Sequence, residues 1–259
     1  MSKIKRILSN VFPVSLRTFH DRMNELLIRI DALRSDVAYG VGDTFIHPDA
    51  PMAKLVGKDT WLEYLTENYN VKGKKILEIG SRNVTGINLR SSFSKADYLG
   101  FDYYAGENVD IVGDAHKLSS YFDKDEKFDL IFSTAVFEHL AMPWLVAIEI
   151  SKLLNIGGGV FVETHFSYSL HETPWHFFQF SHMALRTLFS PALGFKCIEA
   201  GYSNQMIGRF LTHPQEPPIH GLYCHVAYMG EKVKDIVDFT WDKVNLADVV
   251  ENTKYPPKE

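Results

Sequence analysis

The sequence predicts an α/β protein in which helices cover a doubly wound seven-stranded sheet, with a further helix at the N-terminus. Short apolar runs alternate with helical segments along the chain, and the first three of these runs each carry an acid near their end. A chain of 259 residues with 46% hydrophobic side chains is long enough to bury one large core. The expected strands lie near residues 75–80, 98–102, 109–112, 129–133, 159–164, 195–201 and 225–229.

The N-terminal segment, residues 1–40, has apolar residues in alternating steps of three and four, which is the spacing of a heptad seam. Ser15 can cap the start of this helix and Gly40 can end it. One interpretation is a short coiled coil that makes the protein a homo-oligomer. The other is an amphipathic helix packed on its own domain, because Leu27 and Ile28 widen the apolar stripe. The seam consists of Leu16, Phe19, Met23, Leu26, Ile30, Leu33 and Val37.

Residues 41–73 lead into the predicted sheet. The stretch up to Lys58 is rich in Gly, Pro and Asp, so we expect a loop, acting either as a lid over a site or as a plain connector. Trp61 to Tyr69 is expected to form a helix beside the sheet. At the other end of the chain, residues 234–259 form a tail of charged and proline-rich sequence.

The first expected strand is followed by a glycine turn in KILEIGSRNVTG, Lys75 to Gly86. Glu78 interrupts an apolar run, and burying an unpaired carboxylate is costly, so this acid either has a structural partner or marks a site. Gly80 permits a close turn, and Thr85 with Gly86 can open a helix whose backbone amides point at a ligand. The segment therefore predicts a strand, turn and helix that cradle a ligand.

Two further acids follow the next two expected strands. Asp102 ends YLGFD, at the offset where nucleoside-binding folds place a carboxylate for ribose hydroxyls. Asp114 ends the third strand and precedes Ala115, and its carboxylate could accept from an adenine amino group. Each acid alone is more often a helix cap or a turn residue. Three in succession indicate a nucleoside-like ligand.

These motifs resemble the class I S-adenosylmethionine-dependent methyltransferases, over residues 74–233. The resemblance implies a Rossmann-like sheet, mostly parallel with an antiparallel last strand, and S-adenosyl-L-methionine as cofactor. It implies that Glu78 serves the methionine amino group and that the turn at Gly80 approaches the cofactor. It also implies that Asp102 binds the ribose and that Asp114 and Ala115 contact the adenine. In FDLIFSTAVFEHL it places Ser133 and Thr134 beside the methionine moiety; Ser81, Gly86 and Tyr103 belong to the same expected site.

One residue departs from the family pattern. Arg82 stands where these methyltransferases usually have a second glycine, and one hypothesis is that Arg82 pairs with the methionine carboxylate. An NAD-binding domain is the nearest rival interpretation. The segment from Gly80 to Thr85 lacks G-x-G-x-x-G, and a buried Glu78 would repel a diphosphate.

Histidines are concentrated where the later strands end. His139 follows the fourth strand, and an insertion at residues 166–182 carries His171 and His176. Methyl transfer to a hydroxyl needs an aligned acceptor and a group that removes its proton, and neutral imidazole suits that task. We expect His176 or His171 as general base, with His139 shaping the pocket. The alternative is that each histidine is structural, and that the aromatic residues of the insertion close the top of the sheet.

The insertion together with the EIGSRNVTG turn resembles a group of bacterial methyltransferases associated with surface polysaccharide or other glycan synthesis. The resulting hypothesis is O-methylation of a sugar hydroxyl of a glycan or nucleotide sugar. A small aromatic or lipid-like acceptor, or a scaffold protein with a degenerate cofactor site, remain alternatives. Glu138 and His139 also allow a metal site, but no ligand spacing supports one, so no metal is expected.

Composition narrows the choice of partners. The net charge of −5 argues against a nucleic-acid substrate, because phosphate contacts need a basic surface. No transmembrane segment is expected, since no run of about eighteen apolar residues lacks charges. The two cysteines, Cys197 and Cys224, lack metal-ligand spacing, and we expect buried thiols in a cytoplasmic protein.

Overall fold

The structure is a computed structural model, and it describes residues 19, 21–30, 47, 49–84, 86–212, 216, 219–245, 247 and 249. By contacts the chain forms two compact units, of which one comprises Met1–Pro48 with Met206–Leu222 and the other Asp49–Gln205 with Tyr223–Glu259. The second unit contains the candidate site.

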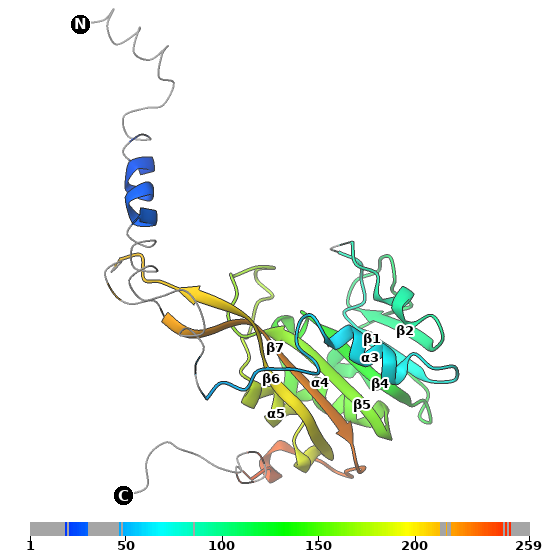
Figure 1. The fold of residues 1–259 in the computed structure, drawn as a ribbon. Coiled ribbons are helices and arrows are strands. Elements are labelled where there is room, and N and C mark those ends of the chain that lie inside the picture. The colour runs from blue at the N-terminus through cyan, green and yellow to red at the C-terminus, as the bar shows by residue number, and fades with distance from the viewer. Residues whose placement is uncertain are drawn as a thin grey trace, which may run out of the picture. The chain divides into compact units, whose positions relative to one another are not determined.

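A seven-stranded sheet with the order β3-β2-β1-β4-β5-β7-β6 organises this unit (Figure 1). Strands β1 to β5 pair in parallel, and β7 pairs antiparallel to β5. The predicted fold class, including the antiparallel last strand, is confirmed. The strands are β1 Lys75–Ile79, β2 Asp97–Asp102, β3 Ile111–Val112, β4 Phe128–Thr134, β5 Leu154–His165, β6 Phe195–Gly208 and β7 Ile219–Lys232.

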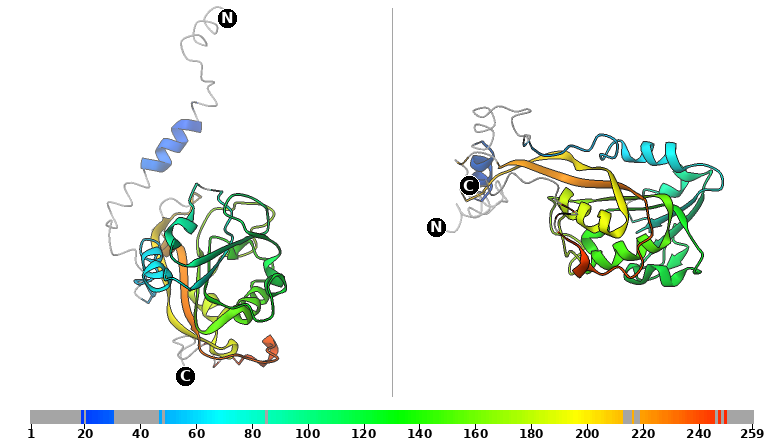
Figure 2. Two further views of the ribbon diagram at one scale, coloured as in Figure 1. Left: turned by 90° about the vertical axis from the view of Figure 1, so that its right-hand side faces the viewer. Right: turned by 90° about the horizontal axis from the view of Figure 1, so that it is seen from below.

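Helices cover both faces of the sheet (Figure 2). Helix α3, Trp61–Tyr69, lies on one face, with the bounds expected from the sequence, while α4, Pro143–Leu153, and α5, His182–Leu188, lie on the other. The 3₁₀ helices are η2 Leu89–Phe93, η3 Ala115–Tyr121, η4 Phe137–His139, η5 Pro191–Leu193 and η6 Trp241–Lys243.

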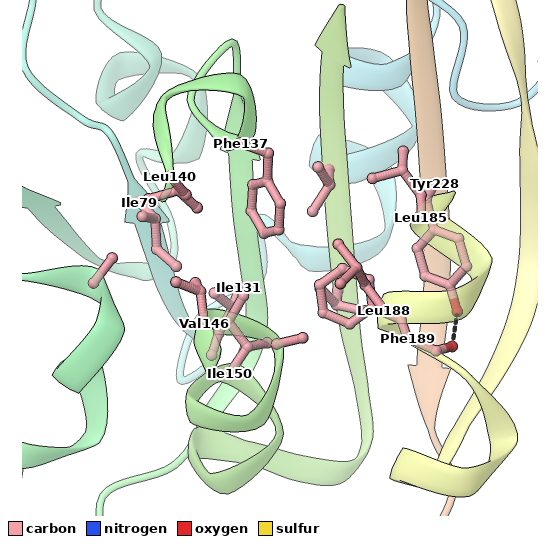
Figure 3. Packing of buried hydrophobic residues seen from close by; sticks show 14 of the residues in the cluster. Ile79, Ile131, Phe137, Leu140, Val146, Ile150, Leu185, Leu188, Phe189 and Tyr228 are labelled. Carbon is pink, nitrogen blue, oxygen red and sulfur yellow. Dashed lines mark hydrogen bonds between the residues drawn. The ribbon is translucent and has the colours of Figure 1, made fainter. Parts of the chain in front are cut away.

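Alternating side chains of the strands build two apolar clusters. Ile79 and Ile131 pack with Val146 of α4 and Leu185 of α5, and the hydroxyl of Tyr228 donates to the carbonyl of Phe189 at 2.8 Å (Figure 3). On the opposite face Trp61 of α3 stacks on Phe161 at 5.3 Å. The period of two in these strands thus places consecutive residues in different clusters, which makes the sheet buried on both faces.

Several expected bounds were wrong. Strand β3 has two residues rather than four, and just before it the carboxylate of Asp110 accepts from the amide of Gly100 at 2.7 Å. Strand β5 begins at Leu154, directly after α4, since Leu154 pairs with Phe128 across an irregular register. Strands β6 and β7 each run for 14 residues, well beyond the short apolar runs that predicted them.

The N-terminal helix is described in part. Residues 21–30 are helical and exposed, with an ion pair of 2.7 Å between Arg29 and Glu25 one turn apart. Leu16, Leu33 and Val37 of the predicted seam lie outside the described residues, so the coiled coil stays a prediction. Among the described helices, none is long and apolar enough to cross a membrane.

The two ends of the second unit are held against the sheet. The carboxylate of Glu199 on β6 accepts from the backbone amides of Leu55 and Val56, both at 2.9 Å, and Met52 bridges to Tyr202. In the tail, Phe239 and Trp241 pack against the core. Residues 49–58 therefore run along β6 as a connector would, and a lid function stays a prediction.

Candidate active site

The residues singled out in the sequence lie at or beyond the carboxyl ends of β1, β2, β3, β4 and β5. Parallel strands end together at one edge, and ligands of doubly wound sheets bind there. The site has two parts. The first consists of the acids and turns that follow β1, β2 and β3, and the second is a group of histidines beyond β4 and β5.

Glu78 is the central acid of the first part. It lies in β1 between the neighbouring residues Gly100 of β2 and Phe132 of β4, with 4% of its surface exposed. Its Oε2 atom makes no hydrogen bond to any residue that the structure describes. Burial raises the pKa of Glu78 to about 8, with Arg90 opposing the rise and Asp102 adding to it. A buried carboxyl with an unsatisfied oxygen fits a ligand that brings a cationic group.

The turn after β1 depends on Gly80. Its φ is +85°, and a Cβ added there would lie 2.1 Å from Cγ2 of Val136. The amides of Gly80 and Ser81 both donate to the carbonyl of Phe101, at 2.8 and 3.2 Å. Gly80 is therefore required by backbone conformation and by the approach of Val136. The approach of this turn to a cofactor stays a prediction.

The helix predicted to open at Thr85 and Gly86 was wrong for the described residues. The amide of Gly86 donates to the side chain of Asn83 at 2.8 Å, and φ of Gly86 is +84°. A left-handed residue held in a local turn does not start an α-helix. The next element is the 3₁₀ helix η2, beginning at Leu89, and Thr85 itself lies outside the described residues.

Asp102 and Arg82 contact each other. The backbone amide of Arg82 donates to Oδ2 of Asp102 at 3.2 Å, and its Nε lies 3.7 Å from Oδ1. The guanidinium also lies over the ring of Tyr104, 5.4 Å from its centre. Arg82 is thus placed beside the acid expected to bind ribose, and its pairing with a methionine carboxylate stays a prediction. Tyr103 follows Asp102 and is exposed.

Asp114 caps the start of η3. It accepts from the amide of His116 at 3.0 Å, and the Nδ1 atom of the same histidine lies 2.7 Å away. Burial raises the pKa of Asp114, but these contacts outweigh it and leave the pKa below its usual value. Ala115 is buried beside it. Asp114 therefore acts as a helix cap, and its contact with an adenine stays a prediction.

Ser133 and Thr134 end β4 next to β1. The hydroxyl of Ser133 is buried and donates to the carbonyl of Ile79 at 2.9 Å, so it holds the ends of the two strands together. Thr134 is half-buried and precedes Ala135, whose φ is +53°. Both residues lie at the edge expected for the methionine moiety.

Glu138 organises the second part of the site. It is fully buried in η4, and its Oε2 accepts from the hydroxyl of Thr164 at 2.6 Å. Its Oε1 faces imidazole nitrogens on several sides. Burial raises the pKa of Glu138, but contacts with His165 and Thr164 outweigh it, so the pKa lies below its usual value. The distances from Oε1 are 2.7 Å to Nδ1 of His165, 3.8 Å to Nε2 of His139 and 4.0 Å to Nε2 of His171.

The insertion brings the predicted histidines together. Its backbone amides at Phe177 and Phe178 donate to the carbonyl of Glu138, and that of Phe180 donates to the carbonyl of His165. These bonds hold the loop over β4 and β5. The ring centre of His171 lies 4.8 Å from the ring centre of His139 and 4.6 Å from that of His176.

The aromatic residues of the insertion have two different environments. Phe178 and Phe180 pack into the core, as the structural interpretation expected. Tyr168, Trp175 and Phe177 stay largely exposed. The ring of Trp175 also lies 6.3 Å from that of Tyr103 after β2, so the insertion reaches the part of the site that contains the acids.

Two residues of this region, Lys58 and His225, were not anticipated from the sequence. His165 and His225 are 5.5 Å apart by ring centres, and burial first, then Lys58 and His165, lower the pKa of His225 to about 4. Lys58 lies 3.0 Å from the buried carboxylate of Glu163. His165 and Glu163 stand at the end of a predicted strand, which was the available signal. Lys58 and His225 come from distant segments and gave none.

Part of the chain is similar to a known family. Residues 70–162 match the family model described as a methyltransferase domain. No curated protein matches the chain.

Solved structures provide similar folds. An S-adenosylmethionine-dependent methyltransferase from Archaeoglobus fulgidus is 13% identical, with 67% of this chain and 96% of that one covered at a TM-score of 0.49. The YcgJ protein from Bacillus subtilis is 15% identical, with 67% and 98% covered at 0.46. A methyltransferase of the same kind from Aquifex aeolicus is 12% identical, with 66% and 88% covered at 0.43.

The matched segment contains Glu78, Asp102, Asp114 and Glu138, but it ends before the histidine insertion. The unsatisfied, buried oxygen of Glu78 fits the positively charged amino group that the cofactor of such a domain carries. The matched residues 70–162 therefore resemble a methyltransferase domain, and the cofactor that this match implies is S-adenosylmethionine.

Proposed function

We propose that this protein transfers a methyl group to a hydroxyl of a sugar, in a glycan or a nucleotide sugar. The observation that carries the proposal is the histidine group beyond β4 and β5, in which Nε2 of His139 and Nε2 of His171 lie 3.8 and 4.0 Å from Oε1 of Glu138. A hydroxyl, unlike an already basic amine, must lose its proton as it attacks, so imidazole beside the acceptor favours this class.

The cofactor supplies a methyl group activated on a positively charged sulfur. When bound, the cofactor would supply the methyl group for the acceptor oxygen, and its sulfur would keep the electron pair of the carbon–sulfur bond. The hydroxyl proton passes to an imidazole nitrogen. Residues of the protein hold the acceptor in line with the methyl group. This alignment accounts for much of the rate acceleration, because it replaces an encounter between two free molecules.

The hydrogen bonds decide which imidazole carries a lone pair at the site. Nδ1 of His171 lies 2.9 Å from the carbonyl of Ser169, and Nδ1 of His139 lies 3.1 Å from the carbonyl of Trp175. A carbonyl only accepts, so each Nδ1 holds the proton and each Nε2 is basic in the neutral ring.

His176 has the opposite arrangement. Its Nδ1 accepts from the backbone amide of His171 at 3.3 Å, so its neutral ring carries the proton on Nε2. Of the predicted bases, His171 is therefore favoured over His176. His139, expected only to shape the pocket, is equally equipped to act as base.

The exposed rings of the insertion support a sugar acceptor. Tyr168, Trp175 and Phe177 are each more than 40% exposed beside the histidines, and aromatic faces pack well against the apolar face of a sugar ring. The same rings favour a second candidate, methylation of a small aromatic or lipid-like metabolite. The direct test is transfer of a labelled methyl group across nucleotide sugars, glycans and small phenols. Label found only in phenols would overturn the sugar proposal.

One contact motivates a non-catalytic alternative. Because Arg82 pairs with Asp102, the acid expected to bind ribose already has a partner. A scaffold protein with a degenerate cofactor site would keep such a pair. Calorimetry with S-adenosylmethionine separates the two: we expect binding with one site per chain, and its absence would leave the scaffold interpretation standing.

A further inference from the structure

The strongest unexplained feature of the site is an unsatisfied pair of polar atoms. Oε1 of Glu138 and Nδ1 of His165 lie 2.7 Å apart, yet neither makes a hydrogen bond of acceptable geometry within the described residues. Glu138 is fully buried and His165 is 7% exposed. Leaving two buried polar atoms unsatisfied is costly, unless a third group lies where both point.

The surrounding side chains hold these atoms in place. Thr164 donates to the other carboxylate oxygen of Glu138 at 2.6 Å, which leaves Oε1 bare. Nδ1 of His171 donates to the carbonyl of Ser169 at 2.9 Å, which leaves a lone pair on Nε2, 4.0 Å from Oε1 of Glu138. His165 is stacked on Tyr168 with 4.3 Å between ring centres. Ligand side chains oriented by outer hydrogen bonds in this way are typical of metal sites.

We propose that Glu138, His165 and His171 bind a divalent first-row transition metal ion. Each offers one ligand atom, and the three atoms lie within 4.8 Å of one another. Two ligands at about 2.0–2.2 Å from one ion are at most about 4.4 Å apart; the two distances from Oε1, 2.7 and 4.0 Å, are within this limit, and the two imidazole nitrogens lie within 4.8 Å of each other. Two imidazoles and one carboxylate select Zn²⁺, Fe²⁺ or a similar ion over Mg²⁺ or Ca²⁺, which prefer oxygen ligands.

A plain ion pair between Glu138 and a protonated His165 is the competing explanation. Such a pair at 2.7 Å accounts for the lowered pKa of Glu138, but Oε1 and Nδ1 both remain without a hydrogen-bond partner among the described residues. It would also leave the Nε2 lone pair of His171, 4.0 Å from Oε1, without a function. The metal accounts for all three atoms.

Three protein ligands leave coordination positions open. The inference here rests on the proposed function: neighbouring hydroxyls of the acceptor fill those positions, and the ion lowers the pKa of the bound hydroxyl. His171 then serves as a ligand, and His139, whose Nε2 is not one of the three, takes the proton. Metal binding itself does not depend on the identity of the acceptor.

The test uses untagged, metal-stripped full-length protein titrated with Co²⁺, whose visible absorption reports coordination. We expect one Co²⁺ per chain and a spectrum typical of a low-coordinate nitrogen and oxygen site. Glu138→Gln, which keeps the side-chain volume, and His171→Ala should each weaken binding by more than the roughly 10–100-fold seen when a supporting residue is lost. Thr164→Val should fall within that 10–100-fold range.

Two controls make the result decisive. His182→Ala removes a half-buried histidine outside the group, which contacts the hydroxyl of Tyr202, and it should leave the titration unchanged. Cys224→Ser probes a neighbouring set formed by His165, Cys224 and His225. A sulfur-to-cobalt charge-transfer band that disappears in Cys224→Ser would overturn the proposed ligand set.

Absence of stoichiometric binding, or binding unchanged in Glu138→Gln and His171→Ala, would overturn the site altogether. Binding of S-adenosylmethionine to the same metal-stripped protein is measured by calorimetry as an independent result. Failure of the metal site and failure of the methyltransferase function are therefore distinguishable.

Discussion

At the scale of single residues, the site combines buried carboxylates in contrasting states. The pKa of Glu78 is raised by burial with no contact to satisfy Oε2, whereas that of Glu138 is lowered because His165 and Thr164 outweigh the burial. Carboxylates whose environments separate their pKa values commonly have different tasks. Glu78 is suited to receive a cation brought by a ligand, and Glu138 already carries its charge in the free protein.

Glu78 makes both stability and cofactor affinity depend on pH. Its pKa in the folded protein, about 8, lies above the ordinary value of 4.5 for a glutamate, so the folded state binds the proton more tightly than the unfolded state. The free energy of unfolding should therefore fall by roughly a few kcal/mol as pH rises from 4.5 to 8. Affinity for S-adenosylmethionine should rise over the upper part of this range, as the carboxylate forms.

Glu78→Gln removes both effects. We expect a weaker pH dependence of unfolding in denaturant, and a loss of roughly 1.5–3 kcal/mol in cofactor binding, typical of a hydrogen bond to a charged group. Glu149→Gln, which alters an acid paired with Ser119 and Lys152, is the matched control for cofactor binding. Unchanged calorimetric affinity in Glu78→Gln would remove Glu78 from the cofactor site.

The imidazoles give a second prediction at this scale. If His171 or His139 acts on the acceptor proton, His171→Ala or His139→Ala should lower kcat by roughly 10²–10⁴-fold, because that is the usual contribution of general base catalysis. His176→Ala should cost less, since its neutral ring presents a proton rather than a lone pair. Single-turnover assays with saturating cofactor measure this, and full activity in all three variants would exclude a histidine base.

At the scale of elements, the turn between β1 and η2 decides how the cofactor edge is built. Gly80 and Gly86 share nearly the same positive φ, but only Gly80 has a neighbour where a Cβ would stand. Comparing these two glycines therefore distinguishes the effect of backbone strain from that of steric overlap. The sequence showed two glycines of apparently equal importance, whereas Val136, 56 residues after Gly80 and on another strand's end, makes them different.

Gly80→Ala should be much more destabilising than Gly86→Ala. Both variants suffer the left-handed strain of about 1–2 kcal/mol. Gly80→Ala adds an overlap with Val136 that costs about 1–3 kcal/mol more in an overpacked core. Denaturant unfolding measures the two free energies, and equal losses would show that the approach of Val136 is not what requires glycine.

The sequence predicted best those elements whose bounds depend on neighbouring residues. Trp61–Tyr69 and the ends of β1, β2 and β4 were anticipated closely, because their apolar periodicity is set by immediate neighbours. The length of β6 and β7 was not, since it depends on strand partners rather than on the strand's own residues. The helix expected after Gly86 was missed because the side chain of Asn83 closes a turn there instead.

At the scale of the whole molecule, the N-terminal helix presents an apolar stripe. Phe19, Met23, Leu26 and Ile30 are each more than 40% exposed. A contiguous exposed stripe of this kind is typical of a surface that associates with another copy or with a partner. Oligomerisation through this helix remains a prediction.

Removal of residues 1–40 should therefore lower the measured molar mass by more than the mass of the removed residues. Leu26→Glu in the full chain should have the same effect, because it places a charge in the predicted seam. Asp21→Lys, an exposed change outside the seam residues, is the control. Light scattering reads all three, and a truncated protein with an unchanged number of chains per particle contradicts the coiled coil.

The sequence by itself determined the sheet, the order of its acids and the concentration of histidines after β4 and β5, because strand periodicity and turn residues are encoded locally. Only the tertiary structure decided which atoms meet. It paired Arg82 with Asp102, engaged Asp114 with His116, and gathered four imidazoles near the buried carboxylate of Glu138. These contacts join residues from separate strands and loops, so their distances depend on how the strands stack and where the insertion is held.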